Sequence, residues 1–246
     1  MSDRRLRNVI AVLWLATAYG LLTLGTGISR AAQENSEVQK GRVYDAKHKN
    51  KLMFLFDRRV EGPPDKHHVV VRFLSPEGKE LVHEEVDYEG ERFHNYTIDK
   101  LQTGEHGEVS VQKGKIQFRY RDRDRKEKQN TETWDNSVIV IDELPWFIQQ
   151  NWKSLKAKKS VPFRFVVPDR AQTVAFELSV RGTGRCKSGP AVLMKMKVRS
   201  ALMGLFAPDV LLTVSEQEPH SICEYTGPTP PYNAELKEVE GRTVFE

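Results

Sequence analysis

Histidine and carboxylate side chains are the residues of this chain that could perform acid–base chemistry or hold a metal ion. His83, Glu85 and His94 lie on two expected neighbouring strands, where they could meet in a metal or general-base site. Their spacing matches no metal-site signature, and they lie at polar strand ends, so exposed surface positions are favoured. The adjacent His67 and His68 point to opposite faces of a strand and cannot share one ion. We expect no catalytic residue and no metal ligand.

No pattern of an activated nucleophile is present in the sequence. It contains no Gly-x-Ser-x-Gly motif, no Ser-x-x-Lys motif and no cysteine beside a histidine. Gly182-Thr-Gly184 is too short for a phosphate-binding loop. The sequence therefore leans away from an enzyme and predicts no cofactor; a hydrolase using His83, Glu85 or His94 is the least favoured alternative.

An aromatic helix is expected over residues 142–156. Pro145 suits a first helical turn, acidic residues precede it, and lysines cluster near the end. Ile148, Trp152 and Leu155 share one helical face, which Trp146 and Phe147 widen. These side chains could simply fill a core, or they could line an apolar cavity. In the second case the ligand-binding residues are expected to be Trp146, Phe147, Trp152, Met194, Met196 and Phe206.

The rest of the chain predicts a mainly β fold. Short alternating segments recur between turn signals such as Ser75-Pro76-Glu77-Gly78 and Lys113-Gly114. About a dozen strands with one helix favour a strongly curved antiparallel sheet, a half-barrel wrapped on the helix. We expect residues 138–141 to form a central strand and 181–190 a glycine-rich loop. The single β-rich domain is expected over residues 43–230, between a linker over 32–42 and a C-terminal tail over 231–246.

The first 31 residues have the layout of a bacterial export signal. Arg4, Arg5 and Arg7 precede an apolar run, and Ser29-Arg30-Ala31 offers small residues for cleavage. The run is also long enough to stay as an uncleaved N-terminal anchor. We therefore expect a periplasmic protein. The alternative is a periplasmic domain anchored at the inner membrane by the uncleaved segment.

Charge gives little support for nucleic-acid binding. The chain carries +4, but residues 1–31 contribute four arginines and one aspartate, which leaves about +1 for the remainder. The dense run over 119–128 interleaves both signs, which favours a solvated hairpin. We expect no nucleic-acid partner, and membrane contact only through the N-terminal segment.

Two cysteines, Cys186 and Cys223, occur in the chain. In an oxidising compartment a single pair favours a disulfide bond. The alternative is two separate buried thiols.

Several segments resemble an uncharacterised family of exported bacterial proteins. They are Leu144-Pro-x-Phe-Ile-x-x-Asn-Trp-x-x-Leu, Val161-Pro-Phe-Arg-Phe, Asp169-Arg-x-x-Thr-Val-x-Phe, Met194-Lys-Met to Asp209-Val-Leu, and Glu224-Tyr-Thr-Gly-Pro-Thr-Pro. The resemblance covers roughly residues 43–230. More distantly, the chain is similar to domains of unknown function. It implies a curved antiparallel sheet around one helix, and it implies no reaction and no site residue.

Two roles follow for such a protein. The first is a non-enzymatic periplasmic protein that binds a lipophilic molecule, or an acyl-bearing component of the cell envelope, inside the curved sheet. The second is a structural or interaction module of an envelope protein complex, which would use a sheet edge or the charged hairpin over 119–128. A tightly packed interior without a cavity would contradict the first role.

Overall fold

The computed structural model describes residues 37–48, 50–199 and 209–246. The expected export segment over 1–31 and the predicted ligand residue Phe206 lie outside these ranges. Within them, no helix has the length and apolar character needed to cross a bilayer.

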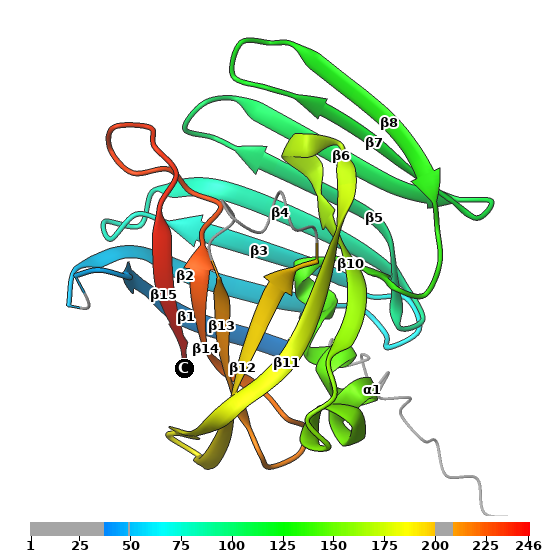
Figure 1. The fold of residues 1–246 in the computed structure, drawn as a ribbon. Coiled ribbons are helices and arrows are strands. Elements are labelled where there is room, and N and C mark those ends of the chain that lie inside the picture. Colours follow the sequence, from blue (N-terminus) through cyan, green and yellow to red (C-terminus); the bar gives the residue numbers. More distant parts are fainter. Residues whose placement is uncertain (1–36, 49, 200–208) are drawn as a thin grey trace, which may run out of the picture. The chain divides into compact units, whose positions relative to one another are not determined.

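The strands form one strongly curved, open sheet (Figure 1). The order is β8-β7-β6-β5-β4-β3-β2-β1-β15-β14-β13-β12-β11-β10-β9, so two meanders meet where β1 pairs with β15. All neighbours are antiparallel except β9 and β10. The strands are β1 (Glu37–Asp45), β2 (Leu52–Glu61), β3 (His68–Leu74), β4 (Glu80–Glu89), β5 (Arg92–Lys100), β6 (Glu105–Gln112), β7 (Lys115–Arg121), β8 (Glu127–Thr133), β9 (Val138–Ile139), β10 (Val161–Val167), β11 (Gln172–Cys186), β12 (Gly189–Val198), β13 (Val210–Ser215), β14 (Ile222–Pro228) and β15 (Glu240–Phe245). This confirms the predicted half-barrel.

Three strand assignments correct expectations from the sequence. β1 begins in the expected linker and continues into the expected domain, and β15 lies in the expected tail, yet the two pair at the middle of the sheet. Each strand buries few side chains, among them Val43 and Thr243, and each is rich in polar residues, so the segments resembled solvated ones in the sequence. The expected loop over 181–190 is instead the end of β11 and the start of β12. The apolar run over 138–141 is a two-residue strand at the sheet edge, not a central one.

Helix α1 (Leu144–Lys156) follows the 3₁₀ helix η1 (Ile141–Glu143). Its buried residues are Leu144, Phe147, Ile148 and Leu155. They pack on the inner face of β10 to β13, against side chains that include Phe163, Leu178, Met194 and Leu212. A second apolar cluster covers the inner face of β2 to β7. The helix therefore fills the inner face of the curved sheet only at β10 to β13. Inward side chains of the strands line the remaining interior.

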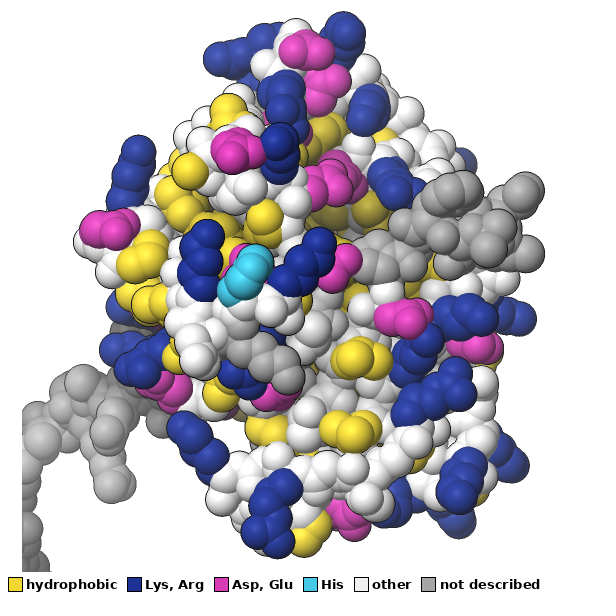
Figure 2. All heavy atoms as spheres, turned by 60° about the vertical axis from the view of Figure 1, so that its left-hand side comes forward, with side chains coloured by type: hydrophobic (Ala, Val, Ile, Leu, Met, Phe, Trp, Pro, Cys, Tyr) yellow, Lys and Arg dark blue, Asp and Glu magenta, His cyan; other side chains and the backbone are white. Residues whose placement is uncertain are grey.

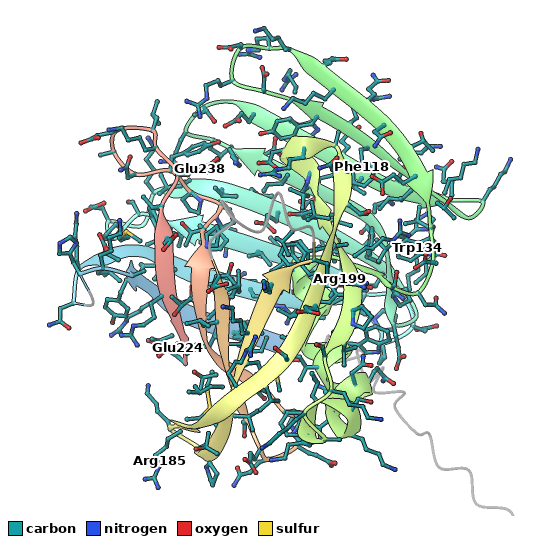
Figure 3. All side chains as sticks on the ribbon, in the orientation of Figure 1. Phe118, Trp134, Arg185, Arg199, Glu224 and Glu238 are labelled. Carbon is teal, nitrogen blue, oxygen red and sulfur yellow. A yellow bond between two sulfur atoms is a disulfide. The ribbon has the colours of Figure 1, made fainter. Side chains whose placement is uncertain are left out.

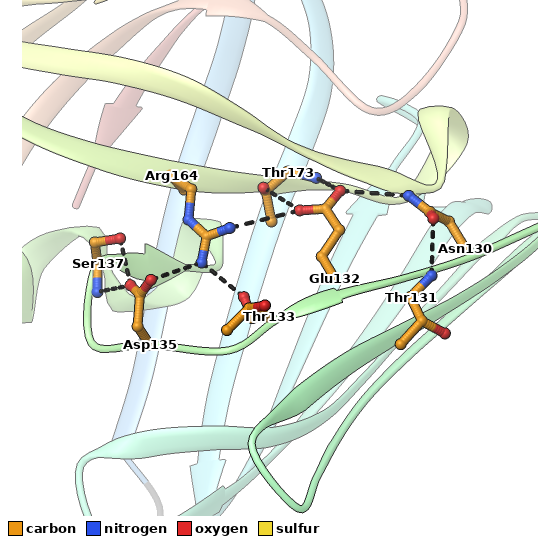
Figure 4. Close-up of polar contacts among 8 residues, drawn as sticks. All are labelled: Asn130, Thr131, Glu132, Thr133, Asp135, Ser137, Arg164 and Thr173. Atoms are coloured by element: carbon orange, nitrogen blue, oxygen red, sulfur yellow. Dashed lines mark hydrogen bonds and ion pairs between the residues drawn. The ribbon is translucent and has the colours of Figure 1, made fainter.

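Hydrogen bonds that involve side chains, rather than strand pairing, connect the edge strand β8 with β10 and β11 near the other edge (Figure 4). Glu132 of β8 accepts hydrogen bonds from the amide and the hydroxyl of Thr173 on β11, the first at 2.9 Å. Arg164 of β10 donates to the Thr133 carbonyl at 2.7 Å and to Asp135 at 2.9 Å. We call these contacts of Glu132 and Arg164 the seam. It turns the open sheet into a nearly complete barrel.

The predicted disulfide is present. Cys186 on β11 and Cys223 on β14 are bonded, with 6.0 Å between their Cα atoms. β12 and β13 lie between these strands in the sheet order, so the tip of the β11–β12 hairpin must bend across to reach β14. Figure 3 shows Arg185 at this tip, while Phe118 of β7 lies within the barrel wall.

The outer surface carries both signs of charge. Figure 2 shows basic side chains spread over one face with acidic side chains among them. The charged run over 119–128 is the β7–β8 hairpin, in which the turn is held by Asp122 accepting the amides of Asp124 and Lys126 at 2.9 Å each. It is the solvated hairpin that the sequence predicts.

Candidate functional site in the barrel interior

A cavity of about 1530 Å³ lies inside the curved sheet. Strand alternation produces its wall, because every second residue of a strand points inward. Apolar side chains from both meanders contribute most of that wall; they include Phe56, Val71, Phe73, Ile98, Phe165, Phe176, Met196, Val198, Val210 and Ile222. The wall of this chamber is thus mostly apolar, and it also carries charged and polar side chains. Those nearest η1 and β5 are described next.

One end of the chamber adjoins η1, and its first polar group is centred on Asp142. Arg58 donates from Nε to Asp142 Oδ1 at 2.5 Å and from Nη2 to Oδ2 at 3.0 Å. Tyr88 donates its hydroxyl to Oδ2 at 2.9 Å. Burial lowers the pKa of Arg58, but the carboxylate of Asp142 more than compensates and the net change is a rise. Arg58 and Asp142 therefore form a charged pair whose charges cancel.

The second polar group is Glu84 with Tyr96. Glu84 is only 2 % exposed and lines the cavity. Tyr96 donates its hydroxyl to Glu84 Oε2 at 3.1 Å. Burial raises the pKa of Glu84 to about 7, and the Tyr96 hydrogen bond only partly opposes this rise. Near neutral pH the carboxyl group thus exists in both the protonated and the charged form.

A third pair, Arg92 and Glu143, fixes η1 against the β4–β5 hairpin. Arg92 Nε donates to Glu143 Oε1 at 3.0 Å, and the same oxygen accepts the Phe93 amide at 2.9 Å. The Arg92 guanidinium also lies 4.9 Å from the Trp134 ring centre and 5.0 Å from that of Trp146. Burial raises the pKa of Glu143, while Arg92 and the bonded amides oppose the rise. This pair is structural, because its oxygens and its cation are already engaged.

The β14–β15 loop borders the chamber at the opposite end of β5. Tyr232 is buried and exchanges two hydrogen bonds with the Gln102 side chain, at 2.8 and 2.9 Å. Its hydroxyl accepts a hydrogen bond from Lys100 at 3.1 Å. The range expected to be a C-terminal tail thus supplies part of the cavity wall as well as a strand.

The predicted ligand-binding residues occupy different positions. Trp146 and Met196 line the cavity. Phe147 and Met194 are buried in the cluster between α1 and the sheet. Trp152 stacks on His220, with ring centres 3.8 Å apart. The structure therefore brings only Trp146 and Met196 of this set to the cavity, and Phe206 lies outside the described residues.

Three residues first considered for chemistry, His83, Glu85 and His94, do not line the chamber, whereas His67 does. His83 bonds Glu80 at 2.6 Å and Glu85 at 3.0 Å on the outer face of β4, whereas His94 approaches Glu89 at 4.0 Å. Burial lowers the pKa of His83, but the two carboxylates raise it overall. In the described part of the chain, no group of His, Cys, Asp and Glu side chains is arranged to hold a metal ion.

Glu84, Arg58 and Asp142 line the interior without having been predicted there. A signal for the first two exists in the alternation of their strands. Val82, Val86 and Tyr88 mark the inward positions of β4, and Glu84 shares their parity. Arg58 likewise continues the inward series of Phe54 and Phe56 on β2. The signal is a charged residue at a strand position where the alternation places apolar residues on the inner face.

Comparisons with known proteins give a fold likeness alone. No family model matches the chain, and no curated protein matches its sequence. Among solved structures, it is similar to a beta-barrel-like protein of domain of unknown function DUF1849 from Brucella abortus. The TM-score is 0.44 at 8 % identity, over 86 % of this chain and 94 % of that chain.

Proposed function

We propose that this domain is a non-enzymatic binding protein that holds a lipophilic or acyl-bearing molecule inside the curved sheet. The observation that carries the proposal is the cavity of about 1530 Å³ with its mostly apolar wall. Small-molecule sites are typically concave and apolar, with a few polar groups that orient the ligand. Both features occur together here, and a tightly packed interior would have argued against this role.

The proposed site of action is an extracytoplasmic compartment, the periplasm. The disulfide between Cys186 and Cys223 supports it, because such bonds persist in oxidising environments. The export layout of residues 1–31 supports it independently.

The alternative roles have less support. An interaction module would use the β8 edge, but Glu132 and Arg164 already engage that edge across the seam. The residues of β8 are polar or charged, which is typical of an edge that avoids strand pairing. A hydrolase would need His83, Glu85 and His94 together; His83 and Glu85 are in contact, but His94 approaches Glu89 instead.

The test is native mass spectrometry with organic extraction, on protein recovered from the envelope fraction of its host. We expect a lipophilic molecule to accompany the wild-type protein. Val71→Trp would fill the cavity from the inner face of β3 and should remove that molecule. Val70→Trp, on the opposite face of the same strand, is the matched control and should retain it.

Two outcomes would contradict the proposal. One is wild-type protein that carries no lipophilic molecule and binds none when exposed to acyl lipids. The other is equal retention by the Val71→Trp and Val70→Trp variants, each confirmed as folded by circular dichroism.

A further inference from the structure

Glu84 occupies a place where an apolar residue would be expected. In the register of the sheet, Arg58 pairs with Val71, Val71 with Glu84, and Glu84 with Ile98. The carboxyl group thus lies between two apolar neighbours on the inner face. Burying a carboxyl group in such surroundings costs free energy unless it is hydrogen-bonded. The Glu84 carboxyl group therefore needs hydrogen-bond donors at this position.

Only one of the two carboxyl oxygens of Glu84 accepts a hydrogen bond from the described residues. Oε2 accepts the Tyr96 hydroxyl, whereas Oε1 has no hydrogen bond within the described part of the chain. The described polar side-chain atoms that are fully enclosed without a partner belong to Asp57, Arg72, Arg121 and Arg242. Glu84 Oε1 is not among them, so it keeps contact with the space of the cavity that Glu84 lines.

The charged groups nearest to Glu84 are engaged by other residues. Arg58 is bound to Asp142 by two hydrogen bonds, and Lys100 is bound to the Tyr232 hydroxyl. Asp142 repels a charged Glu84, while Lys100 and, from the outer face, His83 attract it at a distance. No cation of the described residues forms an ion pair with Glu84. The cavity wall therefore offers an acceptor with negative charge to whatever enters.

We propose that Glu84 and Tyr96 form the polar anchor of the cavity, and that they bind the amino head group of a lipophilic amine. An ammonium group donates hydrogen bonds and cancels the carboxylate charge. A neutral hydroxyl would gain the hydrogen bond without the charge, and a fatty carboxylate would be repelled. This inference rests on the proposed function and narrows it to one class of ligand.

The experiment compares three probes that share one chain length: dodecylamine, dodecanol and dodecanoate. Their binding to the protein isolated from its host, after removal of bound lipid, is measured by titration calorimetry at pH 7.5. We expect dodecylamine to bind about tenfold more tightly than the other two, which corresponds to roughly one bonded, charge-neutralising contact. Glu84→Gln should remove this preference while leaving dodecanol binding within about threefold of wild type. Glu85→Gln, which changes the outward neighbour, should behave as wild type.

The outcomes separate the inference from the proposed function. If none of the three probes binds, the proposed function fails and the inference fails with it. If all three bind equally, or if the Glu84→Gln variant keeps the preference for the amine, the inference alone is overturned. Tyr96→Phe gives an additional check, because it should weaken dodecylamine binding without abolishing it.

Discussion

Glu84 links the chemistry of the cavity to the stability of the fold. Its pKa is about 7 in the folded protein against an ordinary value of 4.5, because burial disfavours the charged form. The folded state therefore holds a proton that the unfolded state releases between these pH values. Stability from this group is full below about pH 4.5 and is lost as the pH rises through 7.

The resulting prediction concerns Glu84→Gln in the absence of ligand. Wild-type protein should lose about 2.5 kcal/mol of unfolding free energy between pH 5 and pH 8 through this one group. The variant should lose that part of the pH dependence, since an amide does not titrate. Urea unfolding at both pH values, with a change of the exposed Glu240, Glu240→Gln, as the control, measures the difference. The same loss in all three proteins would contradict the assignment.

At the scale of elements, the seam is the part of the barrel that no main-chain pairing secures. Glu132 bonds both the amide and the hydroxyl of Thr173 and lies 3.7 Å from Arg164. Glu132→Ala should lower the unfolding free energy by about 1–3 kcal/mol, because it leaves those donors without their acceptor. It should also speed amide exchange at Thr173, measured by hydrogen–deuterium exchange. Glu127→Ala, on the exposed start of β8, should change neither quantity, and equal effects of the two variants would rule out the seam as the cause.

The elements also show which features of this fold a sequence can predict. Turn residues and alternation identified most strands and the Lys113-Gly114 hairpin, because those signals are local. The run over 138–141 was misplaced at the sheet centre. Val138, Ile139 and Val140 are buried, and Glu143 accepts the Val140 amide. The apolar sequence therefore indicated burial correctly, but it did not indicate how many strands lie beside the segment. The β1–β15 pairing joins segments at the two ends of the domain, and no local pattern encodes it.

For the whole molecule, the sequence predicted an apolar interior, but it did not predict most of the residues that line the cavity. A curved sheet with one aromatic helix predicted an apolar interior. The helix residues nearest the sheet, Phe147 and Ile148, fill its end of the barrel, and the cavity opens beyond them on the Met196 side. Which residues pack and which leave space depends on how far the helix extends along the strands. That is a property of the assembled barrel and not of any one segment.

The disulfide provides the test of how the whole molecule relates to its compartment. It closes a loop between residues 37 apart in sequence, which in the chain-entropy description stabilises the fold by about 3–4 kcal/mol. The Cys186→Ala/Cys223→Ala variant should show that loss in urea unfolding, and a reductant should destabilise only the wild type. In cells, a thiol-alkylating reagent applied without reduction should leave the exported protein unmodified. Alkylation of both cysteines in the native host would mean that the pair is reduced there. The bond would then not contribute in the cell, and the proposed extracytoplasmic location would lose its support from the disulfide.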